Sequence, residues 1–311
     1  MKRDLVGYGE HPPRVPWPND AKVAVSVVLN YEEGAESSIA LGDPVDEDIS
    51  VFGGWSSPPD RRSMMKESFF EYGARAGVWR LLGILREFDV PSTVFACGMA
   101  LERNPDVASA FIRDGHEVGC HGYRWRGTVG LSEEAERAEI KRSIASIEET
   151  TGVRPVGWYV RDGITERTRD ILVEEGLIYD SNAYSDDLPY YVPTAGGHHL
   201  VLPYAGDTND ARFWGQGSLS TADDFTAVLS DTLEMLLIEG ATVPKLMSVG
   251  IHTRIGGRPG IAIALRRFIE YAQAQQDVWF ATRADIARWW LANGPAPATP
   301  PEAVTETAAR R

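Results

Sequence analysis

The sequence predicts an α/β fold in which strands and helices alternate around a barrel, complete or incomplete, within a single domain. Apolar strand-like runs and helical patterns alternate about seven times along the 311 residues, and no sequence repeat accompanies them. The first run, residues 21–30, is β-branched and nearly all apolar, which is typical of a parallel strand covered on both faces. No glycine-rich phosphate fingerprint follows it, so nothing supports an open dinucleotide-binding sheet.

The same patterns place the individual elements. Short apolar runs bounded by glycine, proline or polar residues predict strands, and apolar residues at helical spacing predict helices. Ser132 and Thr165 are suited to cap the helices that follow them, and Gly152 and Gly176 to end those helices. The predicted strands are 21–30, 91–97, 117–120, 156–160, a short one that starts at 179, 199–204, 245–252 and 278–282; the predicted helices are 69–88, 104–113, 132–150, 165–175, 223–238, 261–275 and 284–291.

Residues outside this alternation divide the chain into three parts. Residues 1–20 are rich in proline and glycine and are expected to form an irregular arm over the barrel domain, residues 21–292. The tail, residues 293–311, has no core-forming pattern and is expected to be mobile. Residues 37–66 form a long loop-like stretch, and loops of this length in a compact domain are usually functional or partly disordered.

Charge and composition exclude several classes of function. The formal net charge is −14, and such a surface repels phosphate backbones, so no nucleic-acid partner is expected. No apolar run approaches the ~20 residues that cross a bilayer, and the N-terminus does not resemble a signal peptide, so no membrane partner is expected. Cys97 and Cys120 are too few for a disulfide framework or a cysteine-based zinc site; a cytoplasmic location and buried, inert thiols are expected.

Polar side chains that can do chemistry follow several of the predicted strands. In a parallel barrel the carboxyl ends of the strands meet at one rim, where functional side chains collect. Carboxylates, histidines and arginines from separate segments are therefore expected to converge on one mouth. The candidates are Glu32 and Glu33 after the first strand, His121, Arg124 and Trp125 after the third, Arg161 and Asp162 after the fourth, Asp186 and Asp187 after a later short strand, and His252 and Arg254 after the penultimate strand.

Each candidate also has a structural alternative. His121 can be a satisfied core histidine, Glu32-Glu33 a solvated pair, and Asp186-Asp187 a turn cap. His198-His199 looks like a metal-binding pair, but it precedes a strand and is expected at the opposite rim. Convergence of independent segments on one rim favours function for the strand-end residues, because such convergence is rarer by chance than any single cluster.

Four motifs resemble those of the polysaccharide deacetylase superfamily. That superfamily has a strand followed by Asp-Asp-Gly, a His-x-x-x-His motif, an arginine motif, and a last strand that ends in Leu-x-His. The resemblance implies an irregular (β/α) barrel of seven strands. The matching residues are Glu32-Glu33-Gly34, His121-Gly122-Tyr123-Arg124-Trp125 with tryptophan in place of the second histidine, Arg161 before Asp162-Gly163, and Gly250-Ile251-His252.

Longer segments resemble the branch of this superfamily that lacks metal ligands and opens cyclic amides, above all the bacterial allantoinases of purine breakdown. Cyclic imide hydrolases share most of these segments. Residues 160–164, Val-Arg-Asp-Gly-Ile, depart from the Gly-Arg-Thr-like segment of the allantoinases, so a different ring remains open as the substrate. The similar segments are Asp4–Gly9, Leu29–Gly34, Glu71–Arg80, His121–Trp125, Asp186–Tyr190, Asp207–Phe213 and His252–Pro259.

The resemblance also bears on the metal. Deacetylases of this superfamily hold zinc with one carboxylate and two histidines. At most Glu33 and His121 remain in those places, because the indole of Trp125 can only donate a hydrogen bond. We therefore expect no tightly bound metal; a low-affinity Zn²⁺ completed by water or by another carboxylate is the weaker alternative.

Residue chemistry then suggests roles for the candidates. A carboxylate of Glu32-Glu33 is expected to act as the general base, and His252 as the general acid for the leaving nitrogen. Arg161 or Arg124, helped by His121, is expected to stabilise the oxyanion. The expected catalytic residues are Glu32, Glu33, His121, Arg161 and His252, and the expected substrate-binding residues are Tyr123, Arg124, Trp125, Trp158, Asp187 and Arg254.

The expected activity is hydrolysis of a C–N bond in a small cyclic amide, namely allantoin or a related hydantoin or cyclic imide. Two alternatives remain: a zinc-dependent deacetylase of a chitin-type or peptidoglycan-type polymer, and an inactive barrel that binds a small ligand. A cytoplasmic location and a covering arm argue against a polymer. The helical stretch Glu67–Arg80 suggests a subunit contact, so a homo-oligomer, dimer or tetramer, is expected.

Overall fold

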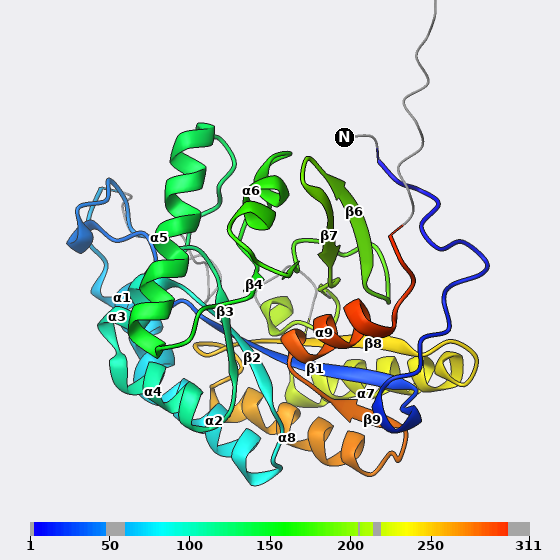
Figure 1. Cartoon of the computed structure of the whole chain (residues 1–311). Coiled ribbons are helices and arrows are strands. Elements are labelled where there is room, and N and C mark those ends of the chain that lie inside the picture. The colour runs from blue at the N-terminus through cyan, green and yellow to red at the C-terminus, as the bar shows by residue number, and fades with distance from the viewer. Residues whose placement is uncertain (1–2, 48–59, 205, 214–218, 298–311) are drawn as a thin grey trace, which may run out of the picture.

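A curled, mostly parallel sheet organises the parts of the chain that the computed structural model describes, which are residues 3–47, 60–204, 206–213 and 219–297 (Figure 1). Helices cover its outer face. The strands are β1 (Val23–Tyr31), β2 (Ser92–Ala96), β3 (Glu117–Cys120), β4 (Gly157–Trp158), β5 (Tyr179–Asp180), β6 (Tyr190–Thr194), β7 (Gly197–Val201), β8 (Lys245–His252) and β9 (Val278–Phe280).

The strand order is β6-β7-β5-β4-β3-β2-β1-β8, and β9 pairs with the beginning of β1. Every ladder is parallel except the β6–β7 hairpin. No ladder joins β8 to β6 in the described ranges, so the sheet curls into half a barrel and stays open on one side. The predicted single-domain α/β barrel is thus confirmed in its incomplete form.

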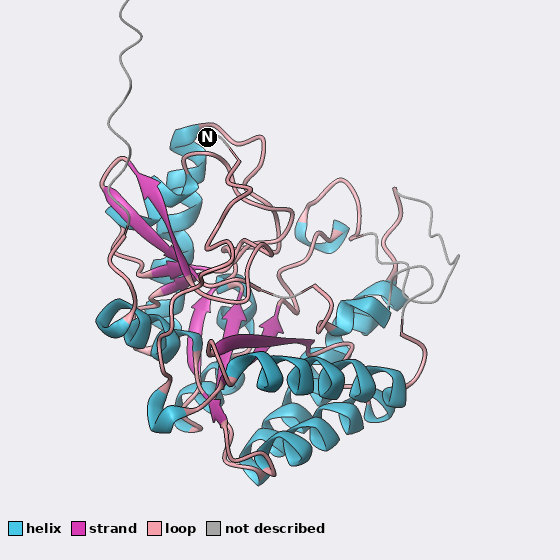
Figure 2. Ribbon diagram, turned by 90° about the vertical axis from the view of Figure 1, so that its right-hand side faces the viewer, coloured by secondary structure: helices cyan, strands magenta, loops and turns pink. Residues whose placement is uncertain are grey.

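Amphipathic helices supply the outer layer. Helices α7 and α8 lie side by side along the sheet, and Figure 2 shows the helices surrounding the strands. Apolar stripes explain this placement, because the stripe faces the sheet. Helix α9 is the exception, since its buried residues Ile286 and Trp290 pack in the cluster on the inner face. The helices are α1 (Met64–Tyr72), α2 (Val78–Glu87), α3 (Gly98–Arg103), α4 (Pro105–Arg113), α5 (Glu133–Thr151), α6 (Thr168–Glu174), α7 (Ala222–Gly240), α8 (Pro259–Gln273) and α9 (Arg283–Asn293), with 3-10 turns at Pro18–Asp20, Ile39–Leu41 and Asp210–Phe213 and a π-helical turn at Gly73–Gly77 between α1 and α2.

Strand β1 separates two hydrophobic clusters. Its odd-numbered residues, such as Val25 and Val27, pack outward with the helices, whereas Ala24 and Val28 pack inward. Successive strand side chains point to opposite faces, so this alternation sets where the residues after Tyr31 point. It positions the acidic pair that follows the strand.

The N-terminal arm fills the inner cluster at the amino end of the strands. The Trp17 ring lies 5.9 Å from Trp279 and 5.8 Å from Trp290, and its Nε1 donates to the carbonyl of Lys245 at 2.8 Å. A buried tryptophan with a satisfied N–H is a strong anchor. The arm is therefore held to the barrel at Trp17.

A buried arginine spans the open side of the sheet. Arg283, at the start of α9, donates through Nε to Ser181 Oγ and through Nη1 to Ser248 Oγ. Its Nη2 donates to the carbonyls of Leu202 and Pro203. Ser248 belongs to β8, and the other partners follow β5 and β7, so one guanidinium joins the two sides that no strand ladder connects.

Three local predictions were wrong in detail. The expected helix 69–88 is two helices joined by the π-helical turn. The expected strand 156–160 has only two strand residues, and strand β6 was not expected. Within the described residues, no helix is long and apolar enough to cross a membrane.

Candidate active site

The acidic pair after β1 is divided between the two faces of the sheet. Glu32 continues the inward series of β1, and Glu33 continues the outward series. Both carboxylates are buried. Of the two residues expected as the base, Glu32 therefore points towards His121 and His252, whereas Glu33 points to the other face of the sheet.

His121 follows β3 and faces Glu32. Its Nδ1 donates to the carbonyl oxygen of Tyr159 at 2.8 Å, and its Nε2 lies 3.0 Å from Glu32 Oε1. The imidazole stacks on the Tyr159 ring, with centroids 5.2 Å apart and planes 9° apart. Both ring nitrogens therefore face oxygen atoms.

His252, at the end of β8, is oriented by Asp210. Its Nδ1 lies 2.7 Å from Asp210 Oδ1, and its Nε2 lies 3.6 Å from Glu32 Oε1. The other carboxylate oxygen, Asp210 Oδ2, accepts the backbone N–H groups of His252 at 2.8 Å and Gly256 at 2.7 Å. Burial lowers the pKa of His252, but Asp210 and Glu32 outweigh it and raise that pKa above its usual value.

Arg254 lies beneath this pair as a fully buried cation, 0% exposed. Its Nη1 lies 2.5 Å from Glu32 Oε2 and 3.6 Å from Glu33 Oε1. Burial would raise the pKa of Glu32, but the charges of Arg254 and His252 outweigh burial and hold that pKa well below its usual range. Glu32 is therefore an ionised carboxylate within the protein interior.

Trp125 forms a wall of the site between two arginines. The Arg254 guanidinium lies 4.6 Å from the Trp125 ring centre, and the Arg161 guanidinium lies 3.8 Å from it. Phe70 packs edge-on against Trp125 at 5.9 Å. Arg161 is 26% exposed and pairs with Glu47 at 3.1 Å, so it lies nearer the surface than Arg254.

Glu33 is enclosed on the outer side of the sheet. Its Oε2 accepts the N–H of Glu32 at 2.9 Å, and its Oε1 accepts the Thr253 hydroxyl at 2.5 Å. A Cβ at Gly73 would overlap its carboxylate, so the π-helical turn needs a glycine there. Burial raises the pKa of Glu33, and a pocket of about 370 Å³ adjoins it on the α1 side.

The residues do not fit the zinc site that the family resemblance implies. No group of three or more His, Cys, Asp or Glu side chains in the described ranges is arranged to hold a metal ion. Glu33 does not face His121, and Trp125 offers no lone pair. A guanidinium already occupies Glu32 Oε2, so a second cation at that carboxylate would meet a like charge.

Two of the predicted pocket residues after β3 serve structure instead. The Tyr123 hydroxyl donates to Glu102 at 2.9 Å and its ring lies under Arg142, between α3 and α5. Arg124 pairs with Asp43 at 2.6 Å and donates to carbonyls of the loop after β1. The loop turns at Gly122, whose φ is 80°, and this turn directs Tyr123 and Arg124 away from His121. Neither is placed to stack on a ring or bind an oxyanion beside His121.

Trp158 and Asp187 also lie outside the cluster. Trp158 is fully buried in the outer core, because it pairs with Cys120 and shares its outward face. The side chain of Asp187 is 63% exposed and lies 3.9 Å from Lys245, at the opposite end of β8 from His252. Strand β8 rises ~3.3 Å per residue, so Asp187 is on the order of 20 Å from the site.

Two residues of the cluster were not predicted. Tyr159 takes the ring position that was expected of Trp158, and counting strand parity from Cys120 and His121 would have indicated it. Asp210 lies in a 3-10 turn rather than at a strand end. Its only sequence signal was its place in the segment Asp207–Phe213, which resembles the same family.

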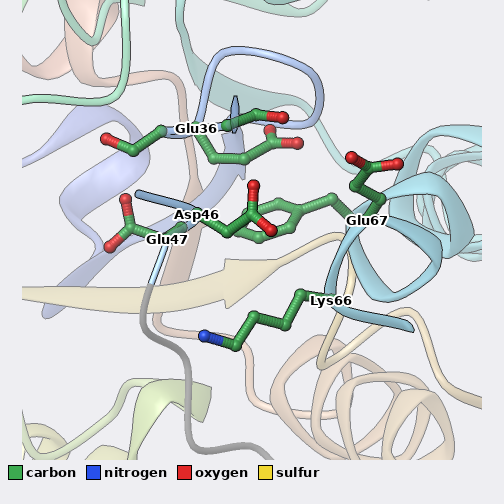
Figure 3. Close-up of a pocket in the computed structure, with 8 residues that line it drawn as sticks. Glu36, Asp46, Glu47, Lys66 and Glu67 are labelled. Atoms are coloured by element: carbon green, nitrogen blue, oxygen red, sulfur yellow. The ribbon is translucent and has the colours of Figure 1, made fainter. Parts of the chain in front are cut away.

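Part of the long loop that was expected to be functional or partly disordered, residues 48–59, lies outside the described residues. The described part gathers acidic side chains against α1 (Figure 3). Asp46 accepts the N–H groups of Ile39 at 2.8 Å and Ser63 at 2.5 Å, and Arg62 pairs with Glu67 at 2.7 Å. These carboxylates therefore hold the loop to the helix. The small pocket between them is lined by Glu36, Ser37, Ser38, Asp46, Glu47, Lys66, Glu67 and Phe70.

Comparisons with known proteins agree with this fold. A model of the family described as polysaccharide deacetylase matches residues 64–177. The "Putative polysaccharide deacetylase" of Schizosaccharomyces pombe is 36% identical over 313 residues, covering 94% of this chain and 98% of the relative.

Two solved structures are similar at 46% identity and a TM-score of 0.90 each, and each covers 95% of this chain. One is a probable polysaccharide deacetylase from Pseudomonas aeruginosa PAO1, of which 100% is covered. The other is Puue allantoinase, of which 99% is covered.

Proposed function

The chain belongs to the polysaccharide deacetylase family of hydrolases, and on that premise we propose that it opens a small cyclic amide by hydrolysing a C–N bond. The substrate class is a hydantoin such as allantoin, or a related cyclic imide. The likeness to Puue allantoinase supports this choice within the family. It would give the chain a role in purine breakdown.

One observation carries the proposal. An ionised carboxylate, Glu32, lies between two histidines and pairs with a buried arginine where the family is expected to bind zinc. This arrangement supplies a base, a hydrogen-bond donor and an acid without a metal ligand set. An amide in a strained or electron-poor ring is a suitable substrate for such a site, because its carbonyl needs less activation than an open acetamide does.

Each of these groups gives or takes a proton, or a hydrogen bond, in the proposed reaction. Glu32 takes a proton from water, and the water oxygen bonds to the ring carbonyl carbon. Once Glu32, whose Oε1 lies 3.0 Å from His121 Nε2, is protonated, the Nε2–H of His121 donates instead to the developing oxyanion. The C–N bond then breaks, and His252 Nε2 gives its proton to the leaving nitrogen, so the product is an open-chain acid. The proton that Glu32 took passes to His252 Nε2, which lies 3.6 Å from Glu32 Oε1, and this restores the starting state. Asp210 stabilises the protonated form of His252 through Nδ1.

The second candidate is a zinc-dependent polysaccharide deacetylase. The names of the S. pombe and P. aeruginosa relatives favour it, and the fold agrees equally with both activities. The donor set argues against it, because Arg254 and Trp125 stand where a bound metal would need ligands. The two proposals differ in substrate and in metal dependence.

A substrate panel separates these candidates. Purified protein is incubated with allantoin, hydantoin, dihydrouracil and succinimide, and separately with chitin oligomers and peptidoglycan, each with a chelator and with added Zn²⁺. Ring opening that resists the chelator supports the proposed function. Release of acetate that depends on Zn²⁺, without ring opening, would establish the deacetylase instead.

A further inference from the structure

We propose that the Arg254 guanidinium takes the structural place of a metal ion: it holds Glu32 in position and makes the site reject divalent cations. The inference deepens the proposed function, on which the positioning role rests. The metal rejection is a property of the folded site and can be measured whether or not a ring amide is opened.

The positive charge of Arg254 lies beside both carboxylates of the acidic pair. Arg254 Nη1 is within 2.5 Å of Glu32 Oε2 and 3.6 Å of Glu33 Oε1, and all three side chains are buried. The ionised carboxylate of Glu32 needs a cation close to it, because water cannot stabilise its charge in the interior. A zinc ion meets this need in a metal site; here a side chain of the chain meets it.

Two aromatic rings, those of Trp125 and Phe70, form a slot around the Arg254 guanidinium. The Arg254 guanidinium lies 4.6 Å from the Trp125 ring centre and 4.8 Å from the Phe70 ring centre. Ring faces attract cations, and a planar guanidinium stacks on them more readily than a hydrated metal ion does. Trp125 therefore removes one metal ligand and forms one wall of the slot that holds the replacement cation. Trp125 and Arg254 therefore act as a unit.

The backbone before Arg254 is held in place by its neighbours. The segment after β8 packs against the π-helical turn, where a Cβ at Gly77 would overlap the carbonyl oxygen of Thr253. Thr253 also donates to Glu33, so the residue before Arg254 is fixed from two sides. This close approach, rather than the arginine's own flexible chain, sets where the guanidinium lies.

The consequence for metals follows from like-charge repulsion. A divalent cation at Glu32 and His121 would share Glu32 with the guanidinium. Restoring a histidine at position 125 should therefore not be enough to create a zinc site while Arg254 remains. Removing the arginine as well should free Glu32 as a ligand.

Zinc binding by four proteins tests this. The wild type, Trp125→His, Arg254→Met and the double variant Trp125→His/Arg254→Met are titrated with Zn²⁺ by isothermal calorimetry, and their metal content is measured after dialysis. We expect the double variant to bind Zn²⁺ at least roughly 100-fold more tightly than Trp125→His, in line with the gain from one ligand or its supporting contacts. Equal affinity of these two variants, or tight binding by the wild type, would overturn the proposal.

Two further variants guard against loss of folding. Arg254→Lys keeps a buried charge, and in the Trp125→His background it should keep Zn²⁺ out. Arg161→Met removes the cation on the opposite face of Trp125, and in the same background it should leave Zn²⁺ affinity unchanged. Zn²⁺ binding by the lysine variant as tight as by the methionine variant would refute the charge argument even if all variants unfold at lower temperatures. Failure to open any ring amide would refute the proposed function alone.

Discussion

Replacing Asp210 with asparagine removes the charge that orients His252 while keeping the side-chain size. The carboxylate accepts three hydrogen bonds: His252 Nδ1 on one oxygen, and the backbone N–H groups of His252 and Gly256 on the other. An amide has a single acceptor oxygen. Asparagine must therefore turn its NH₂ group either towards the imidazole or towards the two backbone donors.

The size of the effect follows from this count. A buried donor left unsatisfied costs about 1–3 kcal/mol of folding free energy. A unit charge about 4 Å from the imidazolium is worth about 4 kcal/mol at an effective dielectric constant of 20. Tenfold in rate corresponds to about 1.4 kcal/mol, so we expect kcat/KM for ring opening to fall by roughly 10²–10³.

The pH profile gives the decisive readout. Asp210 raises the pKa of His252, and the general acid must be protonated, so activity falls as the pH rises through that pKa. In Asp210→Asn this alkaline limb should move to lower pH. His252 stabilises the fold below its unfolded pKa and loses this effect as the pH rises through its folded pKa, so the difference in unfolding free energy should shrink at high pH.

Asp180→Asn is the matched control. Asp180 is equally buried and pairs with Arg169 at 2.8 Å, away from His252. It should lower the melting temperature without moving the alkaline limb. An unchanged limb in Asp210→Asn, or the same displacement in both variants, would refute the assignment of His252 as the acid.

Three other changes, one of them paired with a control variant, test the geometry. Tyr159→Leu removes the ring that stacks on His121 but keeps the backbone acceptor. We expect kcat/KM to fall roughly tenfold, which corresponds to about 1.4 kcal/mol lost with the orientation of His121. The control Trp158→Phe should lower the melting temperature and leave kcat/KM within about twofold. Asp187→Asn should change stability by less than about 0.5 kcal/mol in urea unfolding and leave kcat/KM unaltered; a large loss of activity would place it at the site after all. Arg283→Met should cost about 3–5 kcal/mol in the same unfolding assay, since four buried oxygens lose their donor; a cost below about 1 kcal/mol would show that the sheet needs no bridge.

The part of the site that was predictable from the sequence depends on strand ends. Glu32, His121, His252 and Arg254 each follow a mainly apolar run, and parallel strands bring their carboxyl ends to one rim. Burial of both faces makes such runs easy to recognise, which is why β1 and β8 were placed to within one or two residues. The barrel architecture, complete or incomplete, followed from the same alternation.

The sequence did not show in which direction several side chains of the site point. Strand β4 has two residues, too few to show which of Trp158 and Tyr159 faces inward. Residue 187 was expected at the site because it follows a short strand, but the chain returns there to the amino end of β8. Asp210 reaches His252 from a 3-10 turn, and neither periodicity nor a strand end marks such a residue.

Arg283 also has a consequence for the order of events during synthesis. Glu32, His121, Asp210 and His252 all leave the ribosome before the arginine that joins the two sides of the sheet. A nascent chain that stops short of α9 therefore carries every proposed catalytic group but cannot close the framework that holds them together. Premature termination or C-terminal proteolysis into α9 would thus yield fragments that lack this bridge between the two sides of the sheet.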